Sequence, residues 1–84
     1  MELNRAVALA EVAGPETALA EVDRLTADGR LAAYRYLPAT RADLLRRLGR
    51  NAEAATAYDE ALTLTDNEAE RAFLTGRRDD ARRL

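Results

Sequence analysis

The sequence contains no cysteine and no histidine among its 84 residues. Without cysteine, neither a disulfide nor a thiolate metal site can hold this short chain together. Without histidine, the chain lacks the commonest metal ligand and the side chain that most often serves as a general base. Adjacent carboxylates, as in Asp59-Glu60 and Asp79-Asp80, point apart on a helix. These features predict a protein that is not an enzyme and that needs no metal and no cofactor.

Strong charge of one sign is also missing, because the formal net charge is only -2. A nucleic-acid surface needs a clustered basic face, so no direct contact with nucleic acid is expected. All thirteen basic residues are arginine, and the one basic cluster, residues 77–83, is interrupted by Asp79 and Asp80. We interpret this cluster as a solvated or frayed helix end rather than a phosphate-binding arm.

Long apolar runs are absent, so no segment is predicted to cross or contact a membrane. The first residues also lack the basic start and apolar run of a signal peptide. The expected location is therefore the cytoplasm.

Helix-forming residues dominate what is present, and β-branched residues never run together. The sequence therefore predicts an all-α fold of about five helices. Apolar residues at helical spacing, with Gly14-Pro15 and Asp28-Gly29 as breaks, indicate the boundaries. The expected helices cover residues 2–13, 15–27, a third that ends at Gly49, 51–64, and a fifth that begins near 67.

The starts of the third and fifth helices depend on individual residues. Pro38 disfavours helix at Leu37, so either a short helical turn precedes Pro38 or Pro38 lies in the first turn of the third helix. Asn67 followed by Glu70 resembles a capping box at the start of the fifth helix. That helix is expected to bury Ala69 and Phe73, with Leu74 as a further candidate, and to fray after Gly76.

The chain matches itself at a shift of 36 residues. Ala6 falls on Ala42, Leu9 on Leu45, Ala18 on Ala54, Val22 on Tyr58 and Leu25 on Ala61. A helical hairpin that repeats at this period is typical of a helical solenoid. The paired alanines would let the two helices of each hairpin approach closely, while the larger residues, Tyr58 among them, pack beside them.

The second repeat resembles the second half of a tetratricopeptide (TPR) consensus. Five residues match it: Gly49, Ala54, Tyr58, Ala61 and Leu62. Asp66 and Pro38 stand where that family usually has Pro and Trp, so the chain is TPR-like rather than a regular TPR. An ordinary amphipathic bundle is the alternative. We expect a single domain over residues 1–84, with hairpins at 1–27 and 35–65 and a capping helix at 67–82.

A longer succession of segments is similar to the C-terminal extension of some bacterial extracytoplasmic-function RNA polymerase sigma factors. It comprises residues 3–8, 14–15, 28–31, 36–39, 41–50, 57–58, 67–71 and 73–74. The resemblance implies a TPR-like domain that modulates transcription initiation. Its implied partners are proteins, namely sigma factor regions, core polymerase or a regulator. The promoter-binding and core-binding regions of such proteins are not in this sequence.

In TPR-like hairpins the first helix of each repeat lines the concave surface. Mapped onto this chain, that surface carries the candidate protein-binding residues Asn4, Arg5, Tyr36, Asp43, Arg46 and Arg47. Arginine offers a planar fork for carboxylates, so this face could hold a peptide or a neighbouring domain. Alternatively, it is a solvated face with weak local ion pairs. A stand-alone peptide-binding adaptor and a homodimer that buries an exposed apolar face remain as other functions.

Overall fold

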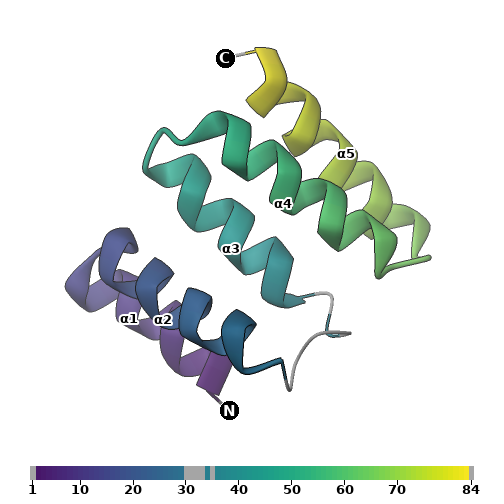
Figure 1. Cartoon of the computed structure of the whole chain (residues 1–84). Helices are drawn as coiled ribbons and strands as arrows, with labels where there is room; N and C mark the ends of the chain where they lie inside the picture. The colour runs from purple at the N-terminus through teal and green to yellow at the C-terminus, as the bar shows by residue number, and fades with distance from the viewer. Residues whose placement is uncertain (1, 30–33, 35, 84) are drawn as a thin grey trace.

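A computed structural model describes residues 2–29, 34 and 36–83 of the chain (Figure 1). All regular structure in this part of the chain is helical, which confirms the predicted all-α fold. The helices are α1 (Glu2–Ala13), α2 (Pro15–Asp28), α3 (Tyr36–Arg47), α4 (Asn51–Thr63) and α5 (Glu68–Arg83). Each helix packs mainly on the helix before or after it in the chain.

The burial pattern follows the 36-residue repeat. Four residues of α2 are buried, namely Ala18, Leu19, Val22 and Leu25. A shift of 36 residues places them on Ala54, Ala55, Tyr58 and Ala61 of α4, which are also buried. The two helices therefore use the same face for the core, as expected for two copies of one hairpin.

Small residues lie where α3 meets α4. Ala42 and Ala54 are fully buried, and the larger Leu45 and Tyr58 are buried beside them. Alanine at the crossing allows the helix axes to approach, and the large side chains fill the space on either side. The alanine that the repeat predicts at the corresponding place of the first hairpin is Ala6, whose side chain lies outside the described residues.

Pro38 lies in the first turn of α3, and this settles the start of that helix. The missing N–H of a proline costs nothing there, because the first-turn N–H groups have no intrahelical acceptor. Leu37 just before it donates its N–H to the Tyr34 carbonyl at 3.0 Å. Helix α3 is thus anchored by a turn, although the residue before a proline usually avoids helix.

Gly49 ends α3 in a left-handed conformation with φ 76°. The N–H of Arg50 bonds to the Leu45 carbonyl at 2.9 Å, and the N–H of Gly49 bonds to the Arg46 carbonyl at 3.0 Å. These two bonds form a Schellman motif, which satisfies the last carbonyls of the helix. The chain can then reverse direction and enter α4 within a few residues.

Helix α5 differs from its prediction in two ways. It continues through Gly76 to Arg83 and does not fray into the basic cluster. It also buries Leu74 and Ala81, whereas Ala69 and Phe73 are exposed. Leu74 and Ala81 are two turns apart on one face, and that face packs on α4.

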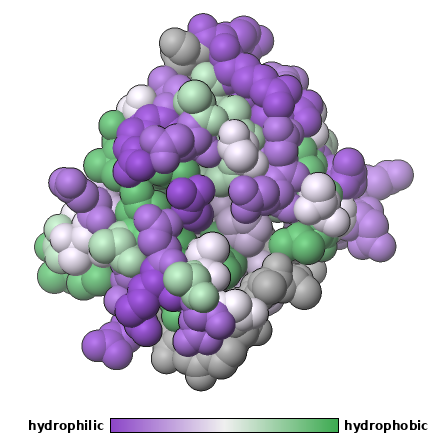
Figure 2. Space-filling view, in the orientation of Figure 1, coloured by the Kyte–Doolittle hydropathy of each residue, from purple (hydrophilic) through white to green (hydrophobic). Residues whose placement is uncertain are grey.

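Figure 2 shows the face of the molecule seen in Figure 1. Hydrophilic residues cover most of it, and hydrophobic residues appear only in separate patches. An unbroken apolar face for self-association is therefore not visible from this side.

Candidate protein-binding groove

A groove of about 360 Å³ lies between the N-terminal halves of α3 and α5. Tyr36 and Ala39 of α3 form one wall. Ala69, Phe73 and Leu74 of α5 form the other, with Glu70 at the edge. Two aromatic side chains stay accessible here, since Tyr36 is 43% exposed and Phe73 is 58% exposed. Accessible aromatic rings over an apolar hollow are typical of protein-binding surfaces.

Hydrogen bonds through Glu70 hold the two walls together. The Tyr36 hydroxyl donates to Glu70 Oε1 at 3.1 Å. The Thr65 hydroxyl donates to Glu70 Oε2 at 2.8 Å, and the Glu70 N–H donates to the Asn67 side chain at 2.9 Å. The Asn67 side chain therefore caps α5 as predicted, and the Glu70 carboxylate accepts a hydrogen bond from the Thr65 hydroxyl. As a result, Glu70 is fixed at the apolar end of the groove.

Charged side chains follow the groove residues along both helices. Asp43 of α3 pairs with Arg46 at 2.7 Å and with Arg47 at 3.0 Å. On α5, the Arg77 guanidinium lies over the Phe73 ring, 5.2 Å from its centroid. This stacking is a cation–π contact, which holds the Arg77 side chain next to the apolar wall.

Tyr58 of α4 lies behind these arginines and is 2% exposed. Burial raises the pKa of its hydroxyl, and Arg46 and Arg77 counteract part of that rise. The charge of Asp43 adds to the rise.

The hydrogen bond to Asp43 raises the pKa of Arg46, and partial burial of the guanidinium opposes this. The Nε of Arg46 is buried and lacks a hydrogen-bond partner among the described residues. The Asp43 carboxylate therefore accepts hydrogen bonds from only some of the N–H donors of the Arg46 guanidinium.

Four of the six predicted site residues lie on α3, and the structure brings three of them together. Asp43, Arg46 and Arg47 form one cluster, and the local ion pairs of the alternative interpretation are present. Tyr36 lies two turns away, at the apolar end. Arg5 is exposed on α1. Asn4 belongs to α1, and its side chain lies outside the described residues.

The sequence pattern did not indicate that α5 contributes to the groove. Phe73 was expected in the core, and Arg77 was expected to be only part of a solvated tail. Their i,i+4 spacing was the available signal, because this spacing places a cation over an aromatic ring on the same helix face.

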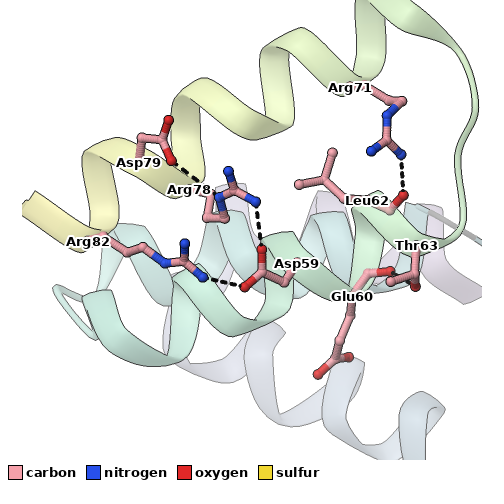
Figure 3. A network of polar contacts seen from close by, with 8 residues as sticks. All are labelled: Asp59, Glu60, Leu62, Thr63, Arg71, Arg78, Asp79 and Arg82. Carbon is pink, nitrogen blue, oxygen red and sulfur yellow. Dashed lines mark hydrogen bonds and ion pairs between the residues drawn. The ribbon is translucent and has the colours of Figure 1, made fainter.

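Three further arginines attach α5 to α4 (Figure 3). Arg71 Nη1 donates to the Leu62 carbonyl at 2.6 Å and to the Thr65 carbonyl at 2.9 Å. Arg78 and Arg82 both pair with Asp59, at 3.0 and 2.6 Å. The arginines of the expected solvated tail therefore help to set the position of α5, and with it the width of the groove.

Within the described residues, no three acidic side chains gather to form a metal site. No helix of the described ranges is both long enough and apolar enough to cross a bilayer.

The chain is similar over most of its length to an uncharacterized protein of Rhizobium meliloti (strain 1021), 47% identical over 72 residues. Those residues are 86% of this chain but only 16% of the relative, so the chain spans about a sixth of the relative's length. No family model and no solved structure matches the chain.

Proposed function

We propose that this chain is a non-catalytic, TPR-like protein-interaction domain that modulates transcription initiation within an extracytoplasmic-function type RNA polymerase sigma factor. The observation that carries the proposal is the groove between α3 and α5, where Tyr36 and Phe73 remain exposed and Arg77 stacks on the Phe73 ring. Such a surface suits recognition of a protein segment.

Two further observations support the proposal. The 36-residue repeat of buried positions in α2 and α4 is the pattern of a helical-repeat module. The Rhizobium relative is about six times longer than the matched segment, so a similar segment exists as one part of a larger protein. The proposal includes a cytoplasmic location. It also includes core polymerase or another sigma factor region as the binding partner.

In vitro transcription with the full-length Rhizobium relative and purified core polymerase tests the sigma factor part. We expect promoter-dependent transcripts, and a changed yield when the matched segment is deleted. A relative that supports no promoter-dependent transcription would contradict the sigma factor assignment. Transcription that is unaffected by the deletion would contradict the regulatory role of the segment.

A peptide-binding adaptor outside transcription is the second candidate, because the groove by itself specifies no process. It predicts that Phe73→Ser abolishes binding to a partner that is neither polymerase nor a sigma factor region. Binding of the purified chain to core polymerase, lost in the same variant, would favour the first candidate instead.

A further inference from the structure

An ion pair between arginine and aspartate joins neighbouring helices twice in this fold. Arg41 of α3 pairs with Asp23 of α2 at 2.8 Å, and Arg78 of α5 pairs with Asp59 of α4 at 3.0 Å. The two aspartates are related by the 36-residue repeat, and the two arginines by a shift of 37 residues. The contact of α5 with α4 therefore repeats the contact of α3 with α2.

Buried apolar residues flank both arginines at the same spacing. One lies four residues before each arginine and one lies three residues after it. They are Leu37 and Leu44 on α3, and Leu74 and Ala81 on α5, and all four are buried. Residues at this spacing share one helix face. Helices α3 and α5 thus each use two apolar side chains and one arginine to pack on the helix before them.

Helix α1 has the same face, but it is exposed. Its residues are Arg5, Ala8 and Val12, which a shift of 36 residues places on Arg41, Leu44 and Leu48 of α3. Arg5 and Ala8 are exposed, and Val12 is almost fully so. The leucines of α3 are buried or partly buried against the core. Among the described residues, therefore, no helix covers this face of α1.

Arg5 also lacks the aspartate partner that the two corresponding arginines have. Within the described ranges, no carboxylate forms an ion pair with Arg5. A hydrogen bond from Arg24 lowers the pKa of Glu21 on α2, and the charge of Arg5 adds to this effect. That carboxylate is bound by Arg24, so the Arg5 guanidinium keeps its N–H donors for another acceptor.

The outer face of α5, at the opposite end of the molecule from α1, is different (Figure 1). On α3, the face that packs on α4 includes Ala42 and Leu45, which are fully buried. The shift of 37 residues places Asp79 and Arg82 of α5 at these positions, and both are exposed. A charged outer face is typical of the terminal helix of a repeat stack. A further helix is therefore favoured next to α1 and not next to α5.

We infer that the exposed face of α1 binds an amphipathic helix from another part of a longer protein that contains this chain. An aspartate of that helix pairs with Arg5, and its apolar residues cover Ala8 and Val12. This inference rests on the part of the proposed function that treats the chain as a domain of a longer protein, and it specifies the contact between the domain and the rest.

The face that α2 and α4 present to the next helix defines the chemistry of the added helix. An apolar residue and an aspartate stand four residues apart there, as Leu19 and Asp23 do on α2, and Ala55 and Asp59 on α4. Leu19 and Ala55 are both buried. A second copy of the chain does not offer such a face, because α3 and α5 already cover it on α2 and α4.

A fusion protein tests the α1 face with a helix of known sequence. It carries a second copy of residues 50–73, which are α4 and the start of α5, directly before Met1 of the full chain. The copied Asp59 then lies 19 positions before Arg5, which is the separation of Asp59 and Arg78. Matched fusions carry Asp59→Asn in the copy only, Arg5→Gln only, or both changes.

Amide hydrogen exchange of α1 is the readout. We expect α1 to exchange at least about tenfold more slowly in the fusion than in the chain alone. Asp59→Asn in the copy and Arg5→Gln should each speed this exchange by about threefold, and both together by no more, because they remove one ion pair. Arg83→Gln, which removes the same charge outside the contact, should change it by less than about twofold.

Val12→Ser separates docking from a local effect on α1. It should speed exchange of α1 at least about fivefold in the fusion but less than about twofold in the chain alone, because Val12 is covered only in the fusion. Circular dichroism melting shows whether each variant is folded.

Cross-linking of the full-length Rhizobium relative tests whether the natural protein supplies the helix. A photo-reactive residue replaces the one that corresponds to Val12. We expect cross-links within one molecule, to a helix outside the matched segment that has the apolar–aspartate spacing. Cross-links only between two copies or only to another protein would overturn the inference, as would unchanged exchange of α1 in the fusion.

The transcription assay of the relative tests the proposed function separately. If the relative supports no promoter-dependent transcription while α1 is covered as expected, the sigma factor role is wrong and the contact stands. If deletion of the segment changes transcription while α1 stays uncovered, the regulatory role stands and the contact is wrong.

Discussion

At the scale of single residues, two glycines adopt different backbone conformations. Gly49 adopts φ 76°, which a residue with a Cβ rarely adopts. Gly76 has no such requirement, because it lies inside α5 with open space around the position of a Cβ. The two glycines therefore differ in physical role although the same residue type occurs at both.

The same substitution should have opposite effects at these positions. Gly49→Ala is expected to lower the free energy of unfolding by about 1–2 kcal/mol, because alanine is strained in the left-handed region. Gly76→Ala is expected to raise it by about 0.5–1 kcal/mol, because alanine loses less conformational entropy in a helix. Urea denaturation of both variants measures this, and equal effects of the same sign would contradict the assigned conformations.

Alanines at the α3–α4 crossing give a second residue-scale prediction. Ala54 is fully buried there, whereas Ala52 on the same helix is exposed. Ala54→Leu should lower the free energy of unfolding by about 1–3 kcal/mol, because the extra volume forces the helices apart. Ala52→Leu, the matched control, should change it by less than about 0.5 kcal/mol. A tolerated leucine at position 54 would show that the helices do not cross closely.

At the scale of elements, the packing of α5 is the feature that shapes the candidate site. Leu74 and Ala81 bury one face of α5 against α4, and arginines on its flanks reach α4 side chains and carbonyls. Phe73 and Arg77 remain on the accessible face because the buried face is already occupied. The position of α5 on α4 therefore also determines the groove.

Arg71 gives a prediction at this scale. Its guanidinium bonds two carbonyls that α4 and the following turn leave unsatisfied, Leu62 and Thr65. Arg71→Ala should lower the free energy of unfolding by about 1–2 kcal/mol, since charged hydrogen bonds are lost near a helix C-terminus. Arg83→Ala is the control, because its partner Asp80 lies one turn away on the same helix. It should cost less than about 0.5 kcal/mol, and a similar loss in both variants would contradict a bridging role for Arg71.

At the scale of the whole molecule, the helices are not equally supported. Helix α4 packs against both α3 and α5, whereas α1 packs mainly against α2. Val12 of α1 is 88% exposed, and among the described side chains of α1, Leu9 and Ala10 are only partly buried against the core. Local opening of α1 should therefore need less free energy than opening of α4.

Native-state amide hydrogen exchange measures this difference. Amides of α4 should exchange near the rate of global unfolding, and amides of α1 should exchange at least about tenfold faster. Comparable protection of both helices would show that α1 is supported by contacts beyond α2.

Helix periodicity was sufficient for most of the fold. The spacing of alanines and leucines, with glycine and proline at the breaks, placed the ends of four helices to within about two residues. The buried stripe of α4, including Tyr58, followed from the same pattern. Local signals sufficed because each of these features depends on residues close together in the chain. The start of α3 was left open, since Pro38 is compatible with two local conformations.

Local sequence patterns predicted only part of the candidate site. The helical class, the 36-residue repeat and the cluster of charges on α3 are predictable from local patterns, because each is a property of one helix or of one chain register. The packing of α5 on α4, by contrast, sets that Phe73 faces outward with Arg77 stacked on its ring. It also decided that the Arg78 and Arg82 side chains bind Asp59. The physical reason is that α5 has apolar residues on two faces, and only the surface offered by α4 selects which of them is buried.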